Sequence, residues 1–342
     1  MRLRISRTSI AFVAVTLLCA ACVVQPVAPS PSPSAPEGTE PAAGKAVSTV
    51  VSSEEGQLNL WGTSGKDIFT VGQHGVIMHF DGQTWSLARS GTEKSRGWFW
   101  LLGVWGTGSD SVYAVGDAGT ILHYDGSEWS YMRSGVYNSL WSVWGTGDED
   151  VFTVGESGTT LHYDGQAWQP MESGTLSDVF AVWAAASNDV FAGCADGTIL
   201  HYDGDAWADT SNLQQRPLYA VWGSSGQDVY AVGYANGFIG QRAVIQHFDG
   251  TKWLAQYSNV DEYDTLYEIW GSSTDDVYAV GGTGTLLHRN GNRSWTPIYT
   301  ESEATLHSVW GSAVDDVFAV GSGGTILHFD GESWTPMPIA TR

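Results

Sequence analysis

The sequence predicts an all-β protein, a seven-bladed β-propeller of four-stranded antiparallel blades, preceded by a signal peptide and a disordered tether. Two observations predict the propeller. A repeat of about 40 residues occurs seven times, and one repeat contains four short strand patterns separated by turn signals. The composition agrees, because 42 Gly, 17 Trp and only 15% charged residues suit Gly-rich turns and aromatic strands.

Residues 1–21 have the pattern of a secretory signal peptide. The basic segment MRLRISR is followed by the apolar run TSIAFVAVTLLCAAC, which is short for a membrane span. The end of that run, LLCAAC, resembles the bacterial lipobox, and the resemblance implies that Cys22 becomes the lipidated first residue of the mature chain. Ordinary cleavage near the same position is the alternative.

Residues 22–52 predict a linker between this attachment point and the propeller of residues 53–342. The stretch VVQPVAPSPSPSAPEGTEPAAG is rich in Pro, Ser and Ala and has too few bulky apolar residues to form a core. An anchor followed by a tether is the order expected of a lipoprotein. We therefore expect an exported protein of a bacterial cell envelope, in the outer membrane or at the cell surface, that contacts the membrane only through its lipid.

Tryptophan marks the repeat. One Trp precedes the first Gly-rich turn of each copy: Trp61, Trp105, Trp144, Trp183, Trp222, Trp270 and Trp310. A second Trp follows in every copy: Trp85, Trp129, Trp168, Trp207, Trp253, Trp295 and Trp334. Because two large rings in each blade can fill the space between neighbouring sheets, we expect these residues in the core.

A single copy shows the four strands of a blade. The third copy has apolar or aromatic strand patterns at 140–145, 151–155, 159–163 and 167–171, with GDED, ESG and an Asp-Gly hairpin signal between them. The chain ends on a complete fourth strand, so the ring closes by packing alone unless residues 46–51, AVSTVV, add a strand. The sequence leaves both open.

The repeated motif DVYAVG…GTILHYDG…W resembles the repeats of bacterial β-propellers of the BNR/Asp-box-like and Ycf48-like kind, over residues 57–337. The resemblance implies the propeller fold and says little about function. Ycf48-like proteins are associated with a basic patch, which this acidic chain does not offer.

The repeated polar residues are expected to be structural. A histidine occupies the same place on the third strand of each blade: His79, His123, His162, His201, His247, His288 and His328. That strand lies roughly 10 Å outside the innermost one, so seven such histidines cannot share one metal ion or one substrate. We expect each to be satisfied by a turn carbonyl or a blade Asp. An Asp six residues after the first Trp is expected to accept a turn N–H: Asp67, Asp150, Asp189, Asp228, Asp276 and Asp316.

Candidate binding residues lie where the repeats differ. Three loops on one face are lengthened, and they supply Trp98, Phe99, Trp100, Tyr234, Phe238, Arg242, Tyr257 and Tyr263. Bulky residues three positions before each first Trp could rim the channel at the same face: Leu58, Leu102, Trp141, Phe180, Tyr219, Tyr267 and His307. From them we select Trp141, Tyr219 and Tyr267 as candidate binding residues. The alternative for the loops is that surface segments tolerate insertions without any binding role. The alternative for the bulky residues is that they pack between neighbouring blades.

The net negative charge of the chain limits the classes of molecule that it can bind. The formal net charge is −22, and loss of Arg2, Arg4 and Arg7 with the signal leaves 12 basic against 37 acidic residues, or −25. Because such a surface repels phosphate groups, we discount nucleic acid and anionic membrane surfaces as partners. We expect a monomeric, non-catalytic binding scaffold for a glycan or a protein, without cofactor, metal or catalytic residues. The alternatives are a glycosidase or lyase with acids near the channel mouth, and a weakly indicated Ca²⁺ site at residues 261–264 or 147–150.

Overall fold

The computed structural model describes residues 59–88, 90, 99–212, 216–237, 240–256, 265–291 and 294–337, with the side chains of 236–237 and 240–242 excluded. The predicted signal peptide, Cys22, the tether and residues 46–51 lie outside the described residues. No helix among the described residues is both long and apolar enough to cross a membrane.

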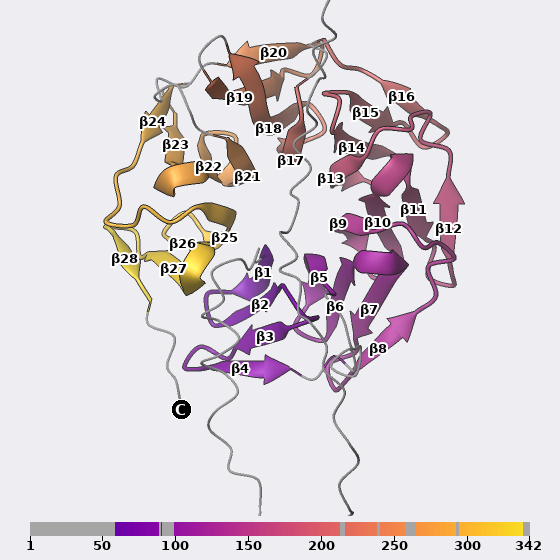
Figure 1. Cartoon of the computed structure of the whole chain (residues 1–342), viewed down its shortest axis with the longest axis horizontal. Helices are drawn as coiled ribbons and strands as arrows, with labels where there is room; N and C mark the ends of the chain where they lie inside the picture. The colour runs from indigo at the N-terminus through magenta and orange to yellow at the C-terminus, as the bar shows by residue number, and fades with distance from the viewer. Residues whose placement is uncertain are drawn as a thin grey trace, which may run out of the picture. The chain divides into compact units, whose positions relative to one another are not determined.

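The predicted seven-bladed propeller is confirmed. Seven sheets each contain four consecutive antiparallel strands, and Figure 1 shows them arranged around a common axis. Blade one contains β1 (Asn59–Ser64), β2 (Asp67–Val71), β3 (Ile77–Phe80) and β4 (Trp85–Ala88). Blade two contains β5 (Leu101–Gly108), β6 (Ser111–Gly116), β7 (Thr120–Tyr124) and β8 (Trp129–Met132). Blade three contains β9 (Leu140–Gly147), β10 (Asp150–Gly155), β11 (Thr160–Tyr163) and β12 (Trp168–Met171).

The remaining blades repeat this order. Blade four contains β13 (Val179–Ala186), β14 (Asp189–Cys194), β15 (Ile199–Tyr202) and β16 (Trp207–Asp209). Blade five contains β17 (Leu218–Ser225), β18 (Asp228–Gly237), β19 (Gly240–Phe248) and β20 (Trp253–Gln256). Blade six contains β21 (Leu266–Ser273), β22 (Asp276–Gly281), β23 (Leu286–Asn290) and β24 (Trp295–Pro297). Blade seven contains β25 (Leu306–Ala313), β26 (Asp316–Gly321), β27 (Thr325–Phe329) and β28 (Trp334–Pro336).

Short 3₁₀ turns join the second and third strands in four blades. They are η2 (Asp117–Gly119), η3 (Glu156–Gly158), η4 (Gly282–Gly284) and η5 (Ser322–Gly324). In blade five this connection is instead a longer hairpin, since β18 and β19 stay paired as far as Gly237 and Gly240. The lengthened loop predicted there is therefore an extension of the blade itself.

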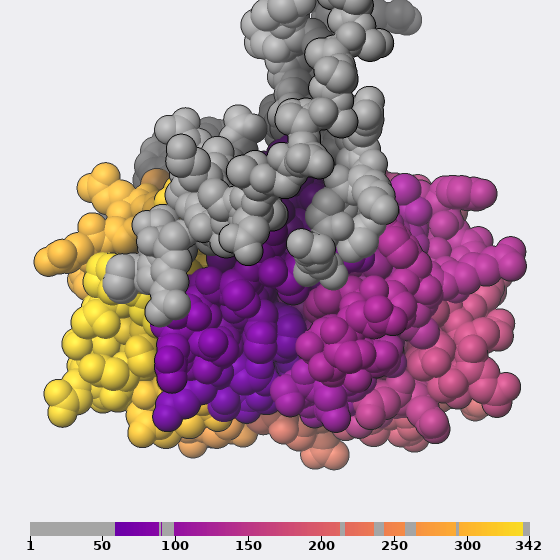
Figure 2. All heavy atoms as spheres, turned by 90° about the horizontal axis from the view of Figure 1, so that it is seen from below, coloured from indigo at the N-terminus to yellow at the C-terminus, as the bar shows by residue number. Residues whose placement is uncertain are grey.

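The ring closes by packing between blades one and seven. Each innermost strand contacts the innermost strands of the two neighbouring blades, and β1 and β25 complete the circle. Figure 2 shows the indigo atoms of blade one directly against the yellow atoms of blade seven. Among the described residues, every sheet takes its four strands from one continuous stretch, so no strand is exchanged at the closure.

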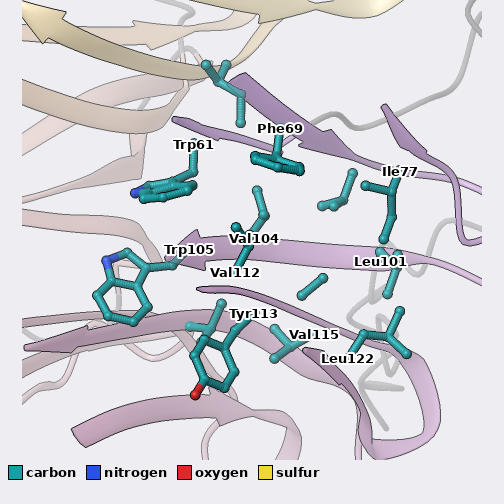
Figure 3. Close-up of a cluster of buried hydrophobic side chains, with 14 of the residues drawn as sticks. Trp61, Phe69, Ile77, Leu101, Val104, Trp105, Val112, Tyr113, Val115 and Leu122 are labelled. Atoms are coloured by element: carbon teal, nitrogen blue, oxygen red, sulfur yellow. The ribbon is translucent and has the colours of Figure 1, made fainter. Parts of the chain in front are cut away.

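Tryptophan rings fill the space between blades, as predicted. Trp61 stacks over Phe69 of its own blade at 6.5 Å, and Trp105 over Tyr113 at 6.3 Å. Figure 3 shows these pairs from adjacent blades in one continuous core. Of the fourteen repeat tryptophans, Trp144, Trp270 and Trp334 are half-buried and the others are buried.

Candidate functional site

The third-strand histidines are structural partners of their own blades. In six blades the histidine Nε2 lies 2.5–2.8 Å from Oδ1 of the repeat aspartate. In all seven, the imidazole packs on an aromatic ring of the second strand, with centroids 4.1–4.5 Å apart. In blade two Ser111 replaces the aspartate, and its Oγ lies 3.1 Å from Nε2 of His123. The expectation of a blade Asp as partner is confirmed.

The repeat aspartate takes a different donor from the one predicted. In five of the six aspartate-bearing blades its second carboxylate oxygen accepts a hydrogen bond from a side-chain hydroxyl four residues earlier, and in blade four Ala185 stands at that position. The pairs are Thr63 with Asp67, Thr146 with Asp150, Ser224 with Asp228, Ser272 with Asp276 and Ser312 with Asp316. The carboxylate thus stands between hydroxyl and imidazole. A hydrolytic triad needs the imidazole next to the hydroxyl, so this constellation does not activate a nucleophile.

An aromatic belt lies at the start of the innermost strands. We use this name for Trp141, Phe180, Tyr219, Tyr267 and His307, which occupy the second position of β9, β13, β17, β21 and β25. Each is the extra residue of a β-bulge. In blade six, for example, Leu266 pairs with Gly281 and Glu268 with Val280, which leaves Tyr267 unpaired. A bulge bends its strand and redirects the extra side chain. The same bulge occurs in blades two to seven, and its extra residue is Leu102 in blade two and a belt residue in the other five.

The belt side chains touch one another from blade to blade. Ring centroids are 5.5 Å apart for Trp141 and Phe180, and 5.3 Å for Phe180 and Tyr219. They are 5.7 Å apart both for Tyr219 and Tyr267 and for Tyr267 and His307. All five side chains are half-buried. The bulky residues selected from the sequence therefore pack between blades and still expose part of each ring.

Tyr234 joins the belt from the extended hairpin of blade five. Its ring stacks on Tyr219 with centroids 5.9 Å apart. Three predicted residues, Tyr219, Tyr234 and Tyr267, therefore lie together, and Trp141 connects to them through Phe180. This contact also places the belt at the end of the ring where β18 and β19 are extended.

Burial keeps the polar atoms of the belt neutral. It raises the pKa of Tyr219 to about 12, with nearby Tyr234 and Tyr267 adding to the effect, and it raises the pKa of Tyr267. Burial also lowers the pKa of His307, whose Nε2 lies 2.9 Å from Oγ of Ser322. The belt thus offers uncharged rings to a ligand at neutral pH.

Other candidates from the sequence do not join the belt. The Phe99 carbonyl accepts the N–H of Gly75 and its ring packs against the core of blades one to three. The N–H of Trp100 donates to Oδ2 of Asp117 at 2.9 Å. The backbone contacts of Phe99 and Trp100 are therefore with blade one and blade two. The rest lie outside the described residues: Trp98, Phe238, Tyr257 and Tyr263, and the side chain of Arg242.

Glu268 is a functional candidate that sequence reasoning missed. It follows Tyr267 and is only partly accessible to water. Burial raises its pKa to about 8, and its hydrogen bond is to the backbone N–H of Ile269, at 3.1 Å. The signal was present in the repeat, because the equivalent residues are Asn59, Gly103, Ser142, Ala181, Ala220 and Ser308. One half-buried acid at a position of otherwise neutral, mostly small residues is an exception that needs a reason.

Asp117 and Glu156 are two further acids that could serve as the carboxylate pair of a glycosidase or lyase. Burial raises the pKa of Asp117, and the negative charge of Glu156 raises it further. Each carboxylate is occupied by a backbone N–H of the preceding loop, that of Trp100 for Asp117 and that of Ser139 for Glu156. This pair therefore fixes loops.

The weak calcium candidates gain no support. In residues 147–150, Oδ1 of Asp148 accepts the Thr107 hydroxyl, and Asp150 is bound to His162 and Thr146. Residues 261–264 lie outside the described residues. Within the described ranges, no group of three or more His, Cys, Asp or Glu side chains could hold a metal ion.

Comparison with known proteins gives the fold alone. No family model and no curated protein matches the sequence. Among solved structures, YCF48 bound to D1 peptide has a TM-score of 0.65 at 16% identity, over 80% of this chain and 91% of that one. YCF48 from Cyanidioschyzon merolae has a TM-score of 0.65 at 16% identity, over 82% and 97%. The WD40 β-propeller domain of Doa1 has a TM-score of 0.64 at 13% identity, over 82% and 93%.

Proposed function

We propose that this chain is a non-catalytic binding protein whose propeller holds a protein partner at the aromatic belt. The observation that carries the proposal is the belt itself, five side chains that β-bulges turn out of the strand pairing in consecutive blades. Partly exposed aromatic rings are typical of the anchoring residues of protein interfaces. A solved propeller of the same fold is described as bound to a peptide, which supports a protein or peptide as the partner.

A protein partner suits the ring geometry better than a glycan. Sugars stack on flat aromatic faces, whereas neighbouring belt rings are inclined to one another by 85°, 32°, 40° and 49° in chain order. Inclined rings surround a side chain instead of forming a platform. The stacked pair of Tyr219 and Tyr234, at 22°, is the flattest part and the place where a glycan would bind if the partner is a sugar.

A photo-crosslinking experiment tests this proposal. A photoreactive phenylalanine analogue at Tyr219 is expected to crosslink a discrete partner in intact cells, and Trp141→Ala in the same chain is expected to reduce that product at least tenfold. The matched control is the analogue at Tyr131, which is 57% exposed on the outermost strand of blade two. Equal products from both positions would contradict the proposal. Saturable binding on a glycan array, lost in Tyr219→Ala, would assign the belt to a sugar.

We also propose that the protein is exported and anchored by lipid at Cys22. The basic and apolar segments of residues 1–21 and the LLCAAC sequence support this. Cells grown with a labelled fatty acid are expected to label the wild-type chain in the membrane fraction, and Cys22→Ser is expected to lose both label and membrane association. Cys194 is a built-in control, because it is fully buried and burial raises its pKa to about 12. Label that persists in Cys22→Ser would contradict lipidation there.

A further inference from the structure

Glu268 lies at one end of the aromatic belt. It directly follows the bulge residue Tyr267 on β21, and His307 begins the next blade with its ring 5.7 Å from that of Tyr267. The repeat shows where a side chain at this position points. A Cβ placed on the equivalent Gly103 would lie 3.1 Å from the carbonyl oxygen of the next blade's bulge residue, Trp141. By this equivalence the Cβ of Glu268 faces the start of the innermost strand of blade seven, beside the belt residues Tyr267 and His307.

No basic side chain of the described residues neutralises this carboxyl. Its hydrogen bond is to the N–H of Ile269. The buried cation of the same blade, Arg289, is engaged elsewhere: Nη1 donates to the carbonyl oxygen of Thr274, and its guanidinium lies 5.6 Å from the ring centroid of Tyr230. A carboxyl that is partly desolvated without a counter-charge is costly to ionise, and a cation brought by a ligand would reduce that cost.

We propose that the belt receives a single cationic side chain, a lysine ammonium or an arginine guanidinium, with Glu268 as its counter-charge. This rests on the proposed function, because it names the chemistry of the group that the partner inserts. The faces of Trp and Tyr rings attract cations, and a carboxylate beside such rings makes the attraction specific for positive charge. The net charge of −22 also favours approach of a basic partner over an acidic one.

The arrangement selects against neutral groups. A norleucine side chain would gain the same contact with the rings of Tyr219 and Tyr267 as lysine but would leave Glu268 without a counter-charge. A carboxylate-bearing group would face Glu268 directly and be repelled. Lysine and norleucine, or arginine and citrulline, are therefore matched probes, since each pair differs mainly in charge.

The test is a binding titration of the full chain with N-acetyl-Gly-Lys-Gly-amide and its norleucine, arginine and citrulline counterparts, followed by calorimetry or NMR. At pH 8.5, where Glu268 is largely ionised, the cationic peptides are expected to bind at least tenfold more tightly than the neutral ones. Glu268→Gln is expected to abolish that preference and to leave binding of the neutral peptides unchanged. Glu128→Gln, in the exposed hairpin of blade two, is the control and should preserve it.

The outcomes separate the two proposals. Equal affinity for lysine and norleucine, or a preference that survives Glu268→Gln, would overturn the cation site. If the partner crosslinked from Tyr219 still binds Glu268→Gln with unchanged affinity, the cation site also fails while the binding function stands. If no crosslinked partner exists and no peptide binds, both proposals fail together.

Discussion

Replacing Trp222 with alanine is expected to lower the free energy of unfolding by about 3–5 kcal/mol. The ring is 7% exposed and stacks over Tyr230 with centroids 6.4 Å apart. Its far edge packs on the next blade so closely that a Cβ added to Gly271 would lie 2.7 Å from the Trp222 Cη2. Removing the indole therefore opens a cavity at the junction of blades five and six. Urea unfolding followed by circular dichroism measures the loss.

Two variants make that result specific. Gly271→Val is expected to destabilise the same junction by overpacking, by about 1–3 kcal/mol, because its side chain would also meet the Asp276 carbonyl. Trp141→Ala removes an indole of the same size from the half-exposed belt and should cost less than half as much as Trp222→Ala. Equal losses for the two tryptophan variants would show that junction packing is not what holds the blades together.

Glu268→Gln is expected to make the chain more stable than the wild type by an amount that grows with pH. Burial raises the pKa of this carboxyl from an ordinary 4.5 to about 8 in the folded chain. Between these values the native state keeps a proton that the unfolded chain has released. The contribution of this carboxyl to the free energy of unfolding is therefore largest below pH 4.5. As the pH rises from 4.5 towards 8, the free energy of unfolding falls by up to about 1.4 kcal/mol per pH unit.

Urea midpoints of both proteins between pH 4.5 and 9 measure this difference. The two curves should converge at the acid end and separate steadily up to pH 8, beyond which the gap stays constant. Glu128→Gln in an exposed hairpin should follow the wild type throughout. A gap that is constant over the whole range would mean that Glu268 ionises normally in the folded chain. A bound cationic peptide should narrow the gap at pH 8.5, because it supplies the missing counter-charge.

The repeat determined the fold of this protein. Seven copies of one pattern, each with a Trp before the first turn and a second Trp on the fourth strand, predicted the number of blades and their strands. Such a prediction succeeds because strand alternation and turn residues act over a few neighbouring positions and are written into every copy. The Asp-Gly hairpins show this well, since Oδ1 of Asp164 accepts the N–H groups of Gln166 and Ala167 as turn chemistry requires.

Only the tertiary structure decided which side chains form the aromatic belt and which carboxyl lies beside it. The sequence marked Trp141, Tyr219 and Tyr267 as bulky and variable, but the bulge that redirects them depends on the register between two strands. The role of the repeat aspartates likewise depends on a hydroxyl and an imidazole from other strands of the blade. Phe180 and His307 joined the belt through contacts between residues about 40 positions apart, and burial raised the pKa of Glu268 beside them. Register arises only when the strands of a blade pair, and the ring contacts of the belt arise only when neighbouring blades meet, so the residue pattern of a single strand contains neither.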